Sequence, residues 1–119
     1  MDLARQWLDA NGYRDVEDVS AKRSCDYVAW KDDVEHVVEV KGTTAGFGTI
    51  LLTANEVELH RSSHPRNLLI VVHDIDLLEM RTEASGGVVR ALEGWNVDET
   101  DLRPLSFSCK LSEQSPTAL

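Results

Sequence analysis

The sequence predicts an α/β or α+β domain in which helices flank one central mixed β-sheet. Two observations support this class. A segment with helical spacing at the N-terminus precedes two short strand patterns at residues 25–41. A continuously apolar run at residues 67–75 is typical of a central strand covered on both faces. The 119 residues suffice for one core, so we expect a single domain over residues 1–112 and a flexible tail over 113–119.

The first half of the chain predicts a helix followed by a hairpin. The helix spans residues 2–12, with Asp2 as a cap and Gly12 as its stop. The strands are Cys25–Trp30 and Glu35–Lys41. If the two residues after Lys31 form the loop, Lys31 pairs with Val34, and the same register places Asp26 directly opposite Glu39.

The second half predicts one more helix between strands. Residues 49–53 form a short apolar pattern that we expect to be a strand. Thr53 and Glu56 match a capping box, so a helix should begin there and end before Pro65. A further strand follows the Gly-Gly pair at residues 86–87, and we expect an edge strand over residues 102–111.

The charge of the chain is strongly acidic. The formal net charge is −9, and eight of the acids lie between Asp74 and Asp101. Such a surface repels a phosphate backbone, which argues against a protein that coats DNA, although a nuclease site must itself be acidic to hold a metal. The sequence contains no apolar run of membrane-spanning length, and Cys25 and Cys109 lack metal-ligand spacing. We therefore expect a cytoplasmic protein without a membrane association.

Charged residues interrupt the second strand of the hairpin. In the predicted register Asp26 and Glu39 project from one face, and Lys41 shares that face two residues further along. Opposed carboxylates destabilise a sheet unless something neutralises them. A magnesium ion with its oxygen ligands would do so, and Lys41 could then assist a water attacking a phosphodiester. The alternative is a solvated ion-pair cluster at a sheet edge.

The motifs around these residues resemble a known nuclease superfamily. Asp26, a hairpin and "EVK" at 39–41 resemble the PD-(D/E)xK superfamily, and the longer string "EVKGT…LLTANEVE" resembles the NO VEIN C-terminal-like domain. The resemblance implies a restriction-endonuclease-like fold. It implies that Asp26 and Glu39 bind the metal, Mg²⁺ or Mn²⁺, and that Lys41 completes the catalytic site. It also implies DNA as the substrate, a role in restriction or defence against foreign DNA, and a homodimer or a larger defence partner.

Further residues are candidates for supporting roles. Glu56 could reach the site, or it could serve only as the glutamate of the capping box. Thr43, in the glycine-rich loop after Lys41, is an auxiliary candidate. Many superfamily members carry an acid on the first helix, where this chain offers only Asp2 or Asp9. A basic cluster is the candidate rim for nucleic-acid phosphates: His60, Arg61, His64 and Arg66.

Three functional hypotheses follow from the sequence. The leading one is a magnesium-dependent endonuclease that hydrolyses DNA phosphodiester bonds. The alternative is a catalytically inactive module of the same fold that binds nucleic acid or a protein partner, which the net charge of −9 favours. A third is a structural interaction domain in which the charges on the hairpin are incidental. Placement of Asp26 and Glu39 on the same face or on opposite faces separates the third hypothesis from the others.

Overall fold

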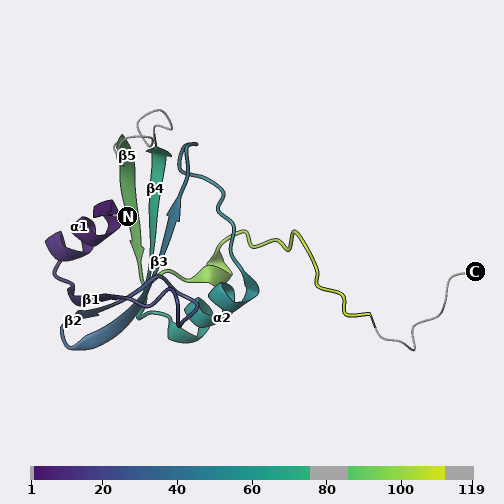
Figure 1. Cartoon of the computed structure of the whole chain (residues 1–119), viewed down its shortest axis with the longest axis horizontal. Helices are drawn as coiled ribbons and strands as arrows, with labels where there is room; N and C mark the ends of the chain where they lie inside the picture. Colours follow the sequence, from purple (N-terminus) through teal and green to yellow (C-terminus); the bar gives the residue numbers. More distant parts are fainter. Residues whose placement is uncertain (1, 76–85, 112–119) are drawn as a thin grey trace, which may run out of the picture.

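The computed structural model describes residues 2–75 and 86–111, so the tail expected at 113–119 lies outside the described residues. The sheet has five strands, and Figure 1 shows helices beside it and an extended segment that continues to residue 111. Along the chain the elements are α1 (Asp2–Ala10), β1 (Arg14–Asp18), β2 (Tyr27–Lys31), β3 (Val34–Gly42), α2 (Ala54–Ser63), β4 (Asn67–Ile75), β5 (Gly86–Glu93) and the short 3-10 helix η2 (Val97–Glu99).

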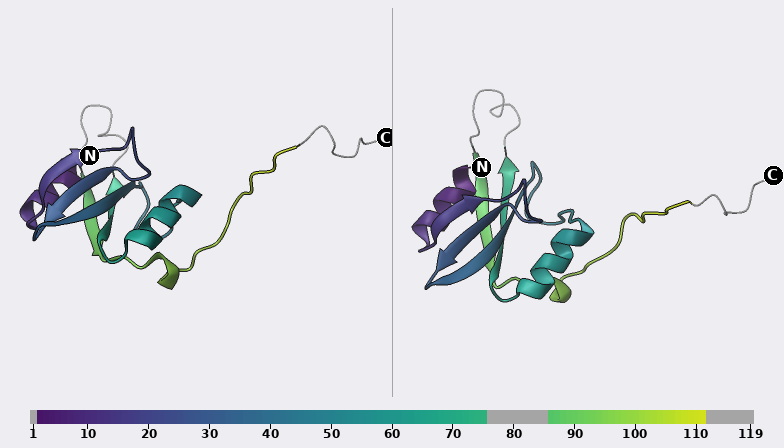
Figure 2. Two further views of the ribbon diagram at one scale, coloured as in Figure 1. Left: turned by 90° about the horizontal axis from the view of Figure 1, so that it is seen from below. Right: turned by 60° about the horizontal axis from the view of Figure 1, so that its bottom comes forward.

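One mixed sheet organises the molecule. Its strands run in sequence order from β1 to β5, with β3 and β4 parallel and the other neighbours antiparallel. The parallel pair requires a crossover, and α2 supplies it. Both views in Figure 2 show α1 and α2 on opposite sides of the sheet. The predicted α+β class is confirmed, and the arrangement is compatible with a restriction-endonuclease-like fold. Neither described helix is long and apolar enough to cross a membrane.

The β2–β3 hairpin has the predicted register. Asp32 and Asp33 form the two-residue turn with φ of 52° and 63°, as a turn with two left-handed residues requires. Lys31 pairs with Val34, and the ladder continues without a slip to Tyr27 opposite Val38. The ladder ends there, and Asp26, just before β2, donates its N–H to the carbonyl of Val38.

The alternation of β3 divides its side chains between two layers. Val38 and Val40 contact the apolar cluster beneath α1, which contains Ala4 and Leu8. Val37, one residue earlier, packs instead with residues on the α2 side, including Leu59. Glu39 follows the same period of two as Val37, so its carboxylate points toward the α2 layer. The α1 layer is thus an apolar core, and the charged residues of β3 lie in the other layer.

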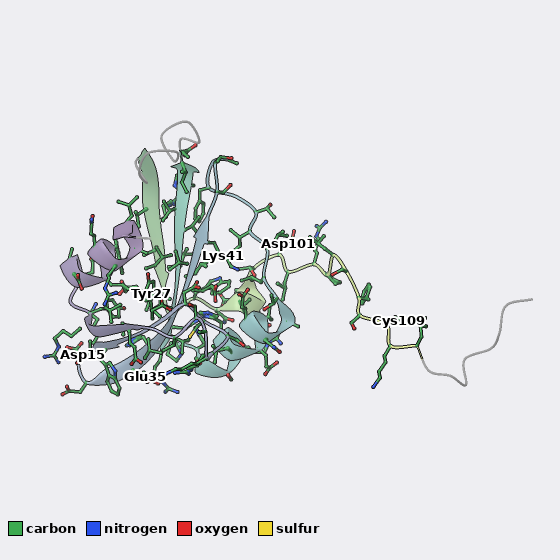
Figure 3. The ribbon with its side chains drawn as sticks, viewed as in Figure 1. Asp15, Tyr27, Glu35, Lys41, Asp101 and Cys109 are labelled. Carbon is green, nitrogen blue, oxygen red and sulfur yellow. The ribbon has the colours of Figure 1, made fainter. Side chains whose placement is uncertain are left out.

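Two predicted strands are wrong. Residues 49–53 are irregular, although Ile50 and Leu52 still pack on an apolar cluster that includes Trp95. Burial of these two side chains explains the apolar pattern. The segment cannot pair with β3, because β2 and β4 already occupy both edges of that strand. Residues 102–111 are exposed and form no strand. Cys109 lies far out on this extended segment, away from the sheet (Figure 3).

The turn conformation makes a prediction about stability. A non-glycine residue in the left-handed region costs about 1–2 kcal/mol, which glycine avoids. We expect Asp33→Gly to raise the free energy of unfolding by about 0.5–1 kcal/mol, measured by urea denaturation. Glu35→Gly is the matched control, and it should destabilise the protein because Glu35 lies in regular β3. Equal destabilisation by both substitutions would contradict the assigned turn.

Candidate active site

A buried carboxylate occupies the centre of the α2 layer. Glu39 is only 2% exposed. Burial raises its pKa above the ordinary value of 4.5; a contact with His60 opposes the shift, and the neighbouring Asp26 and Glu56 carboxyls add to it. Charged Glu39 is therefore disfavoured by its surroundings unless a cation compensates it.

Lys41 supplies part of that compensation. Its Nζ lies 3.6 Å from Glu39 Oε2 and 3.0 Å from Glu56 Oε1. Figure 3 shows Lys41 extending from β3 on the side of the following loop. One ammonium group thus lies between two carboxylates that come from different elements. Glu39 and Lys41 lie on the same face of β3, as predicted.

Glu56 combines the two roles that the sequence left open. Its Oε1 accepts a hydrogen bond from the backbone N–H of Thr53, and the Thr53 hydroxyl accepts from the N–H of Glu56, which completes a capping box. The same Oε1 accepts from Lys41 Nζ. Although burial raises the pKa of Glu56, the Thr53 amide and Lys41 outweigh this and lower it below its usual range. Glu56 therefore caps α2 and belongs to the charged site.

Asp26 lies just before β2, beside Glu39. Its Oδ2 accepts a hydrogen bond of 2.8 Å from the backbone N–H of Val40, and its own N–H donates to the carbonyl of Val38. These two bonds hold Asp26 against β3 on either side of Glu39. The Asp26 carboxyl also contributes to raising the pKa of Glu39.

His60 is not part of a surface rim, and this prediction is wrong. Its side chain is fully buried, because the helical period turns it inward with Val57 and because it packs against the Trp95 ring at 5.1 Å between centroids. His60 Nδ1 lies 3.0 Å from Asn67 Nδ2, which also donates to the carbonyl of Trp95 at 2.8 Å. His60 Nε2 faces Glu39 Oε1 at 3.8 Å.

The remaining rim residues differ in their surroundings. His64 and Arg66 are exposed beyond the end of α2. Arg61 is exposed as well, but its guanidinium is held by the Asp98 carboxylate, with the shortest contact at 2.7 Å. The hydroxyl of Thr43 accepts a hydrogen bond from the N–H of Ala45 within the loop. His64 and Arg66 are therefore the rim residues most available to a phosphate.

The first helix does not approach this site. α1 covers the opposite face of the sheet, where its buried residues pack on Val38 and Ile70. Asp9 is an exposed residue of that helix. The acid sought on the first helix is thus on the wrong side of the sheet to meet Glu39, and the additional carboxylate beside Lys41 comes from α2 instead.

The donor set suits a hard divalent cation held mainly by water. Within residues 2–75 and 86–111, no three His, Cys, Asp or Glu side chains are grouped as ligands of one metal. Magnesium commonly takes only one or two carboxylates and keeps several waters. Asp26 and Glu39 meet this requirement, and Glu39 Oε1 is a buried oxygen without a hydrogen-bond partner.

Sequence reasoning missed the buried pair His60 and Asn67. Two signals were present. Val57 and His60 are three residues apart, a spacing that places them on the same helical face. Asn67 is the polar first residue of the apolar run that becomes β4, where a buried amide needs partners.

The raised pKa of Glu39 predicts how stability depends on pH. Because the folded protein holds this proton more tightly than the unfolded chain, the wild type loses stability as pH rises from 4.5 through the raised pKa. With a chelator present, Glu39→Gln should be more stable at neutral pH by about 1 kcal/mol. The difference should shrink toward pH 4.5 in thermal unfolding. Glu35→Gln, on the exposed part of β3, should show no such gap, and an equal gap in both variants would contradict the burial effect.

Comparison with known proteins places these residues in a family. Residues 1–83 match the family described as Protein NO VEIN, C-terminal. No curated protein matches the chain, and neither does any solved structure. The matched range includes the hairpin, Lys41 and the start of α2, which together form the site. Because the match covers more than half of the 119 residues, the chain belongs to the NO VEIN C-terminal family.

Proposed function

We propose that this protein is a metal-dependent nuclease of the PD-(D/E)xK type that hydrolyses phosphodiester bonds in DNA. The observation that carries the proposal is the buried Glu39 carboxylate. It is 2% exposed, its pKa is raised, and its oxygen Oε2 lies 3.6 Å from Lys41 Nζ. A fold that retains such a destabilising charge beside Asp26 and Lys41 has the features of a site arranged for a cation.

The residues of the site would have distinct roles in the reaction. Asp26 and Glu39 would hold the metal, which supplies Lewis-acid activation of a water and of the phosphate. Lys41 is already placed between Glu39 and Glu56, so its ammonium can orient the water or stabilise charge that develops on a phosphate oxygen. Glu56 holds the Lys41 ammonium beside Glu39 through its 3.0 Å contact. The biological setting that we propose is restriction of foreign DNA, with a second copy or a defence partner supplying specificity.

The mechanism predicts selective loss of cleavage. Plasmid DNA incubated with Mg²⁺ or Mn²⁺ should be nicked by the wild type, whereas Glu39→Ala and Lys41→Ala should each reduce the rate at least about 100-fold. The matched controls are Glu35→Ala on the same strand and Lys31→Ala at the hairpin end, which should retain the wild-type rate. Metal-dependent nicking that survives both site substitutions would rule out this site.

An inactive module of the same fold is the second candidate. The net charge of −9 favours it, as does the contact of Lys41 with two carboxylates, which compensates part of the negative charge of the site without a metal. Calorimetric titration with Mg²⁺ separates the two candidates. Heat of binding and an increase in melting temperature support the nuclease, whereas neither signal supports the inactive module.

The exposed residues beyond α2 predict how DNA binds. Arg66→Ala should weaken binding to duplexes of any sequence and reduce the salt slope by about one, because one phosphate contact is lost. Arg14→Ala is the control, since it removes the same charge from β1 at the far edge of the sheet. Fluorescence anisotropy at several salt concentrations measures both. Equal effects would mean that Arg66 acts only through net charge.

A further inference from the structure

Two buried polar atoms face each other behind the site without hydrogen-bond partners. They are Glu39 Oε1 and His60 Nε2, which are 3.8 Å apart. The two residues are 2% and 0% exposed. The separation is longer than a hydrogen bond, and an unsatisfied buried polar group is costly. The pair is therefore placed for a contact that a shift of less than 1 Å, to the normal range of about 2.7–3.2 Å, would complete.

The partners of Asn67 determine which nitrogen of His60 carries the proton. The carbonyl of Trp95 can only accept a hydrogen bond, so the Asn67 atom 2.8 Å away must be its amide nitrogen. The second hydrogen of that nitrogen is directed at His60 Nδ1, 3.0 Å away. Nδ1 must therefore accept, and the proton of the neutral ring belongs to Nε2.

This tautomer excludes His60 as a metal ligand. A ring nitrogen that carries a proton has no lone pair for a cation. Moving the proton to Nδ1 would set an N–H against the Asn67 amide nitrogen, and rotating the amide would set its oxygen against the carbonyl of Trp95. Nε2–H is thus a hydrogen-bond donor directed at Glu39 Oε1.

We propose that His60 and Asn67 are positioning residues for Glu39. His60 Nε2–H donates to Oε1 when the carboxylate is charged, so that Oε2 is directed toward Lys41 and the cation. Asn67 keeps His60 in the donating tautomer. The consequence for the cation rests on the proposed function, whereas the contact between His60 and Glu39 does not. Carboxylates and histidines that orient a metal ligand from behind commonly act in this way.

The tautomer of His60 is tested in the wild-type chain. Nitrogen-15 NMR of the metal-free protein at neutral pH should show Nε2 protonated and Nδ1 bare. Asn67→Leu should abolish this preference, because Nδ1 then loses its donor. A wild-type ring that carries its proton on Nδ1, or on both nitrogens, would overturn the proposal. This measurement requires neither metal nor DNA.

Substitutions of His60 test the contact itself. His60→Gln retains an N–H near the position of Nε2, whereas His60→Leu removes it. The carbon-13 shift of the Glu39 carboxyl in metal-free protein should move in the leucine variant and remain near wild type in the glutamine variant. His64→Leu, one helical turn further along and exposed, is the matched control and should leave the shift unchanged. Identical carboxyl shifts in wild type and His60→Leu would overturn the proposal.

The Mg²⁺ affinity of the His60 variants tests whether the contact between His60 and Glu39 affects metal binding. His60→Leu should bind Mg²⁺ about 10–100-fold more weakly than wild type by calorimetry, and His60→Gln should recover most of this loss. Equal affinity of the leucine variant and wild type would overturn the positioning role. If wild type binds no Mg²⁺, the proposed function fails, and the tautomer and the carboxyl shift still decide whether His60 holds Glu39.

Discussion

The burial of the Glu39 carboxylate is the constraint on which the site depends. β3 lies between β2 and β4, so a side chain on its α2 face is enclosed by neighbouring strands and by the helix above. A charged group in that position needs compensation from several directions. The structure provides Lys41 on the same strand and His60 from α2, whereas Asp26, just before β2, adds a further negative charge. Each of these contacts exists because the fold brings its element to this one carboxylate.

The two faces of the sheet differ in composition. The face beneath α1 is an apolar cluster whose members come from α1, β2, β3 and β4. The face beneath α2 contains smaller apolar clusters with the charged residues between them. Most of the hydrophobic stabilisation on the α1 side is thereby independent of the chemistry on the other side. Such a fold can keep an unfavourable buried charge in one layer, because the apolar layer on the opposite face still stabilises the folded protein.

Local patterns allowed much of this structure to be predicted. The hairpin register followed from the turn at Asp32 and Asp33, and the start of α2 followed from the Thr53–Glu56 box, because both depend on residues adjacent in sequence. The burial of His60 could not be read in the same way. It depends on Asn67 and Trp95, which reach the histidine through the arrangement of β4 and the segment after β5. Apolarity at residues 49–53 indicated burial correctly but not backbone pairing, since an irregular segment can bury the same side chains.

A single oxygen atom joins the initiation of a helix to the charge balance of the site. Glu56 Oε1 accepts from the Thr53 amide at 2.9 Å and from Lys41 at 3.0 Å. Positions 41, 53 and 56 are consequently coupled in the structure. Replacement of the lysine removes the cation from Glu56, and replacement of the glutamate leaves the Thr53 amide without its acceptor and Lys41 with Glu39 as its remaining carboxylate. A substitution at position 56 therefore alters the charged site and the first turn of α2 together.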